Sequence, residues 1–66
     1  MDIRFSRHAK NKLRLYGLAA ADVKTPIEAG ESVNIAGKWE SRYGKLRVIW
    51  VMVGSYALVI TLIRTR

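Results

Sequence analysis

The side chains of this sequence best suited to chemistry are cations that could hold a phosphate. Arg42, Arg47 and Arg64 lie in its β-rich C-terminal half, and a guanidinium group can form paired hydrogen bonds with a phosphate. His8 is the single histidine, the residue type that ionises near neutral pH and therefore the natural general acid or base. The alternatives are three solvated arginines at a sheet edge and a histidine that caps or packs at a strand-to-helix junction.

Further basic and aromatic side chains could bind nucleic acid. The chain has 12 Lys and Arg residues against 5 Asp and Glu residues, a net charge of +7, which favours a polyanionic partner but also serves solubility. Trp39 and Tyr43 could stack on bases or could simply cover the sheet. The candidate RNA-binding residues are Arg7, Lys12, Trp39, Arg42, Tyr43 and Lys45.

Several classes of site are excluded by residue types that the sequence lacks. There is no cysteine and only one histidine, so neither disulfides nor a Cys- or His-based zinc site is expected. The five acidic residues are scattered, without the paired spacing of an acid/base or two-metal site. Standard nucleophile and phosphate-loop motifs are also missing. We therefore expect no metal and no cofactor.

The apolar run Val48–Ile63 contains no charge and must be either a membrane span or part of the core. A helix over it would be about 24 Å long, shorter than a hydrocarbon layer of about 30 Å. Half of its residues are β-branched, and Gly54-Ser55 divides it at the midpoint. The run therefore predicts a hairpin of strands Leu46–Val53 and Tyr56–Ile63, joined by a two-residue turn.

Both faces of this predicted hairpin are apolar, so both should be covered. An antiparallel sheet with one solvated face alternates apolar and polar residues, and this hairpin does not. The helices of so short a chain can cover one face. We expect the other to be covered by a loop, a second copy of the chain or a partner protein. The alternative is a face that is only half covered and tolerates exposed aliphatic side chains.

The register of the hairpin decides whether the arginines meet. A turn at Gly54-Ser55 places Arg47 opposite Leu62, and a turn at Gly44-Lys45 places Arg42 opposite Arg47. Arg64 then lies diagonally from Arg47 on the same face, and the three arginines form one basic cluster. A slip of one residue would scatter them.

The N-terminal half predicts a strand and two helices. Ile3–Phe5 alternates as a short strand, and Ser6 is a suitable N-cap for a helix over Arg7–Tyr16 that ends at Gly17. Ala9, Leu13 and Tyr16 fall on one face of this helix, the spacing of a buried stripe. A second helix is expected within Ala20–Ala29, either kinked at Pro26 or interrupted near Lys24 and restarted with Thr25 as its cap.

Two further strands, Val33–Ile35 and Trp39–Tyr43, precede the hairpin, and the whole chain, residues 1–66, reads as a single domain. The order is written β-α-α-β-β-β. It predicts an α+β fold with two N-terminal helices on one face of an antiparallel sheet of three to four strands.

Two short stretches resemble a known family. The opening Phe5-Ser6-Arg7-His8-Ala9, followed by Gly17-Leu18 and Asp22-Val23, and the ending Val59–Arg64 are similar to a family of small bacterial and archaeal domains that open F-S-x-H-A and end in V-I-T-V. That family is similar in layout to BrnT and, more distantly, to the RelE/ParE toxin superfamily. Lys12 and Tyr16 depart from the pattern, which usually has arginines there.

The resemblance implies a cytoplasmic, metal-independent ribonuclease whose basic and aromatic side chains position the scissile phosphate. It implies an antitoxin partner and an RNA or ribosome target, with His8, Arg47 and Arg64 as the catalytic candidates. Two alternatives need no catalysis: a module that binds RNA or the ribosome, and a module that forms a homodimer through the second sheet face. The N-terminus has no apolar stretch typical of a signal peptide.

Overall fold

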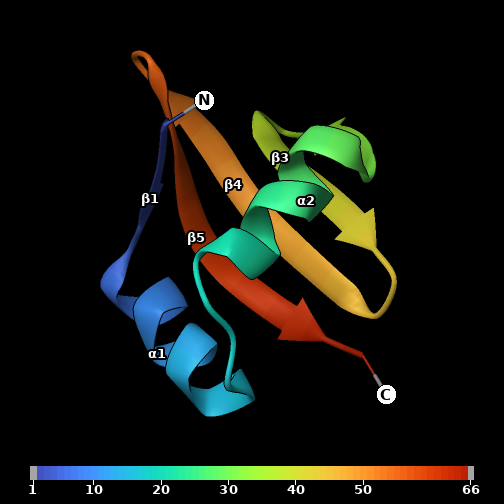
Figure 1. The fold of residues 1–66 in the computed structure, drawn as a ribbon. Coiled ribbons are helices and arrows are strands. Elements are labelled where there is room, and N and C mark those ends of the chain that lie inside the picture. Colours follow the sequence, from blue (N-terminus) through green and yellow to red (C-terminus); the bar gives the residue numbers. More distant parts are fainter. Residues whose placement is uncertain (1, 66) are drawn as a thin grey trace.

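The computed structural model describes residues 2–65, which form five strands and two helices (Figure 1). Both helices lie on one face of the sheet, α1 against β5 and β1, and α2 against β3 and β4. The predicted α+β class is confirmed. In chain order the elements are β1 (Asp2–Phe5), α1 (Arg7–Tyr16), α2 (Ala21–Ala29), β2 (Glu31–Ile35), β3 (Lys38–Tyr43), β4 (Leu46–Val53) and β5 (Tyr56–Arg64).

The sheet is larger than predicted and is mixed. Its strand order is β1-β5-β4-β3-β2, so it has five strands where three to four were expected. β1 joins the far edge beside β5 and runs parallel to it, whereas the other neighbours are antiparallel. The parallel pair is possible because nearly the whole chain separates the two strands, which leaves room for the crossover that parallel strands need.

Helix α1 is capped at both ends as the sequence predicts. The Ser6 hydroxyl accepts a hydrogen bond of 3.1 Å from the Ala9 N–H, which satisfies one of the free amides of the first turn. Gly17 closes the helix with φ 66°, a left-handed conformation that suits glycine. The predicted stripe is also confirmed, since Ala9 is buried and Leu13 and Tyr16 pack against the core.

Helix α2 continues through Pro26 as one element, and neither break nor restart occurs at Lys24 and Thr25. Pro26 is buried against the sheet, so its packing offsets the missing hydrogen bond. Gly30 follows at a point where α2 and β3 come close. A Cβ on Gly30 would meet the Arg42 carbonyl oxygen and would lie 2.6 Å from the Pro26 carbonyl oxygen.

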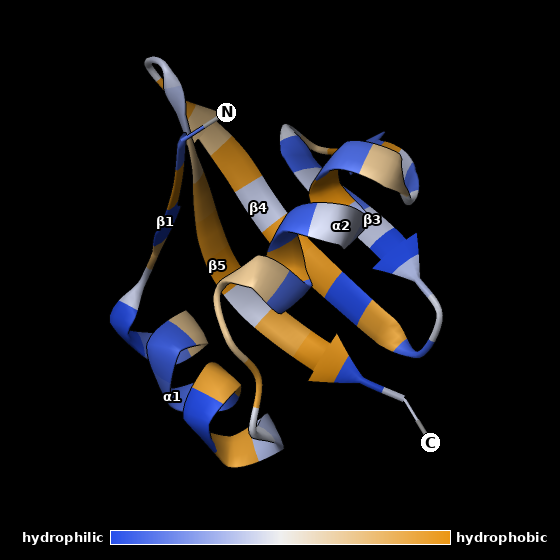
Figure 2. Ribbon diagram, viewed as in Figure 1, coloured by the Kyte–Doolittle hydropathy of each residue, from blue (hydrophilic) through white to orange (hydrophobic). Residues whose placement is uncertain are grey.

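The core lies between the helices and the hairpin, and Figure 2 shows apolar residues concentrated on β4 and β5. Its fully buried polar residue is Ser41, whose hydroxyl accepts a hydrogen bond of 2.9 Å from the Trp50 indole N–H. Ser41 also shares a 2.7 Å hydrogen bond with Ser32 on β2. The buried apolar residues are Ala9, Val23, Ile27, Val48, Trp50, Ala57, Val59 and Leu62.

The predicted hairpin is confirmed, but its register changes halfway along. Near the turn, Val53 faces Tyr56 and Val51 faces Leu58, as expected. Between Ile49 and Trp50 the register then shifts by one residue, so that β5 contains a bulge.

The bulge is tied to the start of α1. The Ser6 hydroxyl donates a 2.8 Å hydrogen bond to the Ile60 carbonyl oxygen, and the Ser6 N–H donates to the Val59 carbonyl oxygen at 2.9 Å. Bulges leave backbone groups without a partner on the neighbouring strand. Ser6 therefore caps α1 and satisfies the bulged strand at the same time.

The second face of the sheet is left uncovered by residues 2–65. Several of its apolar side chains are exposed, among them Val33, Ile35, Val53 and Ile63. We call this surface the open face. The expectation of two apolar faces agrees with the structure, which covers one of them with the helices.

Candidate functional site

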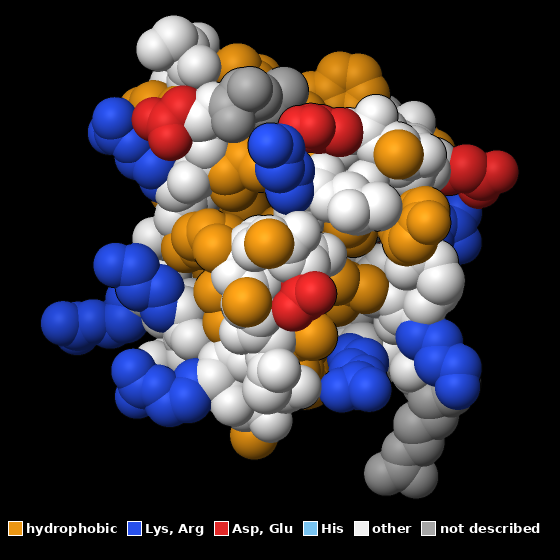
Figure 3. All heavy atoms as spheres, viewed as in Figure 1, with side chains coloured by type: hydrophobic (Ala, Val, Ile, Leu, Met, Phe, Trp, Pro, Cys, Tyr) orange, Lys and Arg blue, Asp and Glu red, His pale blue; other side chains and the backbone are white. Residues whose placement is uncertain are grey.

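Four cations lie at one end of the sheet, where the β3–β4 turn and the end of β5 come together (Figure 1). Lys45 is in the turn, Arg42 and Arg47 face each other across β3 and β4, and Arg64 pairs with Leu46. In Figure 3, Lys and Arg side chains gather at this lower right end of the molecule. The predicted opposition of Arg42 and Arg47 is therefore correct.

The three arginines do not form the single cluster that the sequence predicted. Because of the bulge, Arg47 faces Ile63 instead of Leu62, and Arg64 pairs with Leu46. Leu46 packs with the core, so Arg64 lies on the helix side of the sheet while Arg42 and Arg47 belong to the open face. Successive strand residues point to opposite faces, and one extra residue is enough to reverse Arg64.

Arg47 and Arg64 each have an acceptor within the chain. Arg47 forms a 3.8 Å ion pair with Glu40, a neighbour on the open face. Arg64 donates a 3.3 Å hydrogen bond from Nη1 to the Tyr16 carbonyl oxygen. That carbonyl lies in the last turn of α1, where a cation is favoured by the helix dipole. Arg64 thus connects the end of β5 to the end of α1.

Two adjoining hollows, with cavity volumes of about 360 and 140 Å³, share Lys45 and Arg64. We call them together the turn groove. Among the described residues that line them, none has an acidic side chain. The lining residues are Tyr16, Leu18, Tyr43, Lys45, Leu46, Arg64 and Thr65.

A third hollow of about 440 Å³ adjoins the turn groove through Tyr43 and is lined also by Arg42 and Glu31. Tyr43 is 54% exposed, so its ring is available for stacking between the two spaces. In this arrangement Lys45 and Arg64 could bind the phosphates of a single RNA strand, and the Tyr43 ring could stack on one of its bases.

The backbone holds the two groove cations in place. The Thr65 N–H and its hydroxyl both donate to the Lys45 carbonyl oxygen, at 2.7 and 3.1 Å. Gly44, the other turn residue, has φ 60°, a conformation that glycine adopts without steric cost. The β3–β4 turn, which contains Lys45, is therefore attached to the end of β5, next to Arg64.

The remaining candidates from α1 lie away from the turn groove. His8 is exposed near the start of the helix, and at 1.5 Å per residue it is about 12 Å along the axis from Tyr16. The Lys12 ammonium lies 5.5 Å from the centre of the Tyr16 ring, but Lys12 is not among the residues that line the turn groove. Arg7 is exposed at the first helical position.

Trp39 and Tyr43 have different surroundings. Trp39 stacks on the Trp50 ring, with 5.8 Å between ring centres and 19° between planes, and it packs against the core. It therefore covers the sheet, whereas Tyr43 faces solvent at the groove.

Tyr16 and Thr65 line the turn groove but were not among the candidates. The buried-stripe pattern of α1 predicted that Tyr16 packs on the core, and it does, but Tyr16 also lines the groove and its carbonyl oxygen accepts a hydrogen bond from Arg64.

No metal site or membrane helix occurs within residues 2–65. No three His, Asp or Glu side chains of this part come close enough to hold a metal ion. None of its helices has the length and apolar content needed to cross a membrane.

Comparison with known proteins finds similarity in structure. No family model and no curated protein matches this chain. A chain in the crystal structure of the toxin–antitoxin complex RelBE2 from Mycobacterium tuberculosis superposes with a TM-score of 0.66 at 18% sequence identity. The superposition covers 96% of this chain and 95% of that one. The predicted RelE-like fold is thereby confirmed.

Proposed function

We propose that this protein is the toxin of a toxin–antitoxin pair and cleaves RNA at the turn groove without a metal ion. The observation that carries the proposal is an acid-free groove in which Lys45 and Arg64 lie beside two tyrosines. The shared fold with a chain of the RelBE2 complex supports it. Fold alone does not determine activity, so the argument depends on the groove.

The groove supplies charge for a reaction that RNA can perform on itself. A ribose 2′-hydroxyl attacks the adjacent phosphorus and the 5′-oxygen of the next nucleotide leaves, giving a 2′,3′-cyclic phosphate and a 5′-hydroxyl. Lys45 and Arg64 would stabilise the charge that builds on the phosphate oxygens, and fixed cations are effective because they are already oriented. The exposed Tyr43 ring would hold a neighbouring base.

Other candidate residues have secondary roles in this proposal. Arg42 and Arg47, on the open face of the same sheet end, would guide the RNA backbone toward the groove. Lys12 and Arg7 would add charge along α1. His8 is about two helical turns from the groove, so we assign it no proton transfer at a phosphate held by Lys45 and Arg64.

The antitoxin would cover the open face. This face exposes Val33, Ile35 and Ile63, and Arg42 and Arg47 lie at its end. A partner segment with an apolar stripe and acidic residues would complement both features. It would also offset the net charge of +7 and would cover Arg42 and Arg47, the side chains proposed to guide RNA toward the turn groove.

A test of this function is induced expression in bacterial cells with and without groove substitutions. We expect the wild-type protein to arrest growth and to fragment messenger RNA, and Lys45→Gln with Arg64→Gln to abolish both effects. Lys24→Gln with Lys38→Gln is a matched control, because it removes the same charge from side chains outside the groove. Equal toxicity of the groove and control variants would overturn the proposal.

One observation favours a second candidate, an RNA-binding module without catalysis. The described lining of the turn groove contains no histidine and no carboxylate, the side chains that most often move protons in catalysis. Purified protein would then bind single-stranded RNA through Lys45 and Arg64 and leave it intact after prolonged incubation.

A further inference from the structure

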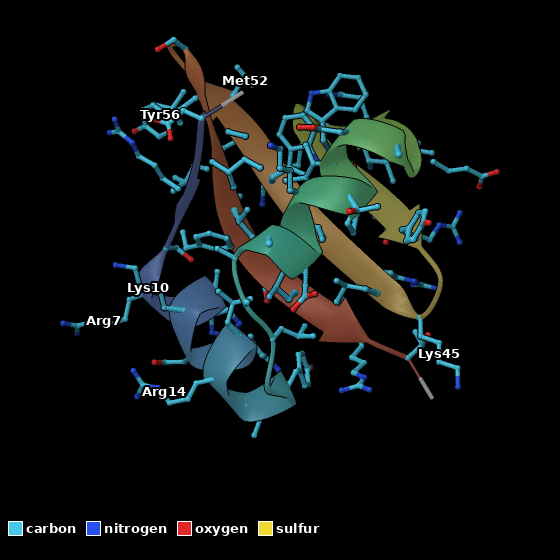
Figure 4. All side chains as sticks on the ribbon, in the orientation of Figure 1. Arg7, Lys10, Arg14, Lys45, Met52 and Tyr56 are labelled. Carbon is cyan, nitrogen blue, oxygen red and sulfur yellow. The ribbon has the colours of Figure 1, made fainter. Side chains whose placement is uncertain are left out.

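The outward face of α1 carries a second basic surface that the proposed function does not use as its site. Arg7, Lys10 and Arg14 are all exposed, and Figure 4 shows them projecting from α1 on the side away from Lys45. We call these three residues the α1 stripe. Their spacing of three and four residues places them on one side of the helix.

Of the three stripe residues, only Arg14 lies where the helix dipole favours a cation, in the last turn of α1. The first turn of α1 has no acidic residue, although the positive end of the helix dipole favours one there. Arg7 and Lys10, and Lys10 and Arg14, are like charges at spacings that repel on a helix. No ion pair to these three residues occurs within the described part of the chain. An external anion would relieve this repulsion.

The helix that carries the stripe is secured at both ends. Ser6 and Gly17 cap the helix at its two ends, and Ser6 is also tied to β5. Successive stripe residues are separated by about 4.5 and 6 Å along the axis. That separation is of the same order as the spacing of phosphates along a nucleic-acid strand.

The stripe has cations but no stacking ring. Tyr16 packs against the core and lines the turn groove on another side. The ring of His8 follows Arg7 in the sequence and therefore lies about 100° around the helix from it. Single-stranded RNA is recognised largely by stacking its bases on aromatic rings, whereas a duplex is recognised through its backbone. The stripe therefore suits a base-paired nucleic acid, and the turn groove with Tyr43 suits an unpaired strand.

A membrane surface fits the stripe less well. A helix that lies in a bilayer surface needs a broad apolar face turned toward the lipid. The apolar face of α1 is occupied by the sheet, since Ala9 is buried and Leu13 packs on the core. Leu15, which is 73% exposed, is the one large apolar side chain of α1 among the exposed hydrophobic residues.

We propose that the α1 stripe binds the phosphodiester backbone of a base-paired nucleic acid, as a surface separate from the turn groove. The proposed binding depends on charge, on spacing and on the secured position of the helix, and it does not require RNA cleavage. Under the proposed function, it would anchor the protein on structured RNA while the groove receives an unpaired strand.

The test is the salt dependence of binding to blunt RNA and DNA duplexes of about 16 base pairs, the length that a protein spans across two minor grooves. Lys10→Gln with Arg14→Gln should lower the slope of log K against log salt by about two, because each phosphate contact contributes about 0.9. The control, Lys24→Gln with Lys38→Gln, loses the same charge elsewhere and should change the slope by much less. Similar binding of the RNA and DNA duplexes would indicate that the contacts are to the phosphodiester backbone. Tighter binding of the RNA duplex would indicate an additional contact with the 2′-hydroxyl. Both results support the proposal.

Two results would overturn it: equal slopes for the stripe and control variants, or binding to anionic vesicles with no binding to either duplex. The stripe variant should unfold at the same temperature as the wild type or higher, which separates lost binding from lost folding. Lys45→Gln with Arg64→Gln should leave duplex binding in place. If the protein neither arrests growth nor cleaves RNA but still binds duplexes through the stripe, the proposed function fails and this inference stands.

Discussion

Ser6→Ala should destabilise the protein by about 2 kcal/mol, because the serine hydroxyl has two structural partners. It accepts from the Ala9 N–H at 3.1 Å, and loss of an N-cap costs about 1 kcal/mol. It also donates to the Ile60 carbonyl oxygen at 2.8 Å in a half-buried position, and a lost hydrogen bond of this kind costs about another 1 kcal/mol.

The measurement is thermal unfolding followed by circular dichroism. For a domain of this size, 1 kcal/mol shifts the midpoint by about 4–8 °C, so the expected decrease is about 8–16 °C. Ser55→Ala is the matched control, because Ser55 is exposed in the β4–β5 turn and a surface substitution changes stability by less than about 0.5 kcal/mol.

The same substitution should also affect the turn groove. Ser6 secures the bulged part of β5, and the bulge places Arg64 on the helix side. We expect amide resonances from Ile60 to Arg64 to shift in the NMR spectrum of Ser6→Ala. A midpoint within 2 °C of the wild type, with β5 resonances unchanged, would refute the reasoning that Ser6 holds both the helix and the bulge.

Three other substitutions test separate parts of the structure. Ser41→Ala should cost about 1–3 kcal/mol by urea unfolding, since it leaves the buried Trp50 indole N–H without an acceptor; a loss below about 0.5 kcal/mol would contradict this. Gly30→Ala should cost about 1–3 kcal/mol, because a Cβ would collide with the Arg42 carbonyl oxygen, and wild-type stability would show that α2 and β3 separate freely. Ile35→Glu should leave stability within about 0.5 kcal/mol, since Ile35 is exposed on the open face, yet should prevent antitoxin binding in a pull-down; normal binding would place the antitoxin elsewhere.

Local patterns in the sequence were sufficient to predict most of the elements. The Ser6 and Gly17 caps, the buried apolar face of α1 and the hairpin turn at Gly54-Ser55 each depend on residues close together in the chain. The hairpin was recognisable because β-branched residues dominate Val48–Ile63. These features correspond to interactions that a short window of sequence contains.

Features that depend on distant residues could not be predicted in the same way. Strand β1 finds its place beside β5 through tertiary packing, and no turn motif links the two. The bulge in β5 is stabilised by Ser6, which lies 54 residues away in the chain. Because the sequence did not predict the bulge, the prediction assigned Arg64 to the wrong face of the sheet. It correctly placed Arg42 and Arg47 opposite each other.

The turn groove was missed for a related reason. Tyr16 reads as a core residue from its helical spacing, and its place beside Arg64 depends on how α1 docks on β5. Lys45 and Tyr43 were selected for their residue types, and the structure brings both to the groove. Residue type alone thus identified several of the residues that line the turn groove. The fold determined which candidates lie together in it.

The central claim is that the turn groove cleaves RNA without a metal ion. Its most direct measurement is the incubation of purified protein and a labelled single-stranded RNA in the presence of EDTA, with product ends analysed by mass spectrometry. The account predicts fragments that end in a 2′,3′-cyclic phosphate, no cleavage of the same strand when every ribose lacks its 2′-hydroxyl, and none by Lys45→Gln with Arg64→Gln. RNA that stays intact with the wild-type protein, or is cut equally well by that variant, would contradict the account.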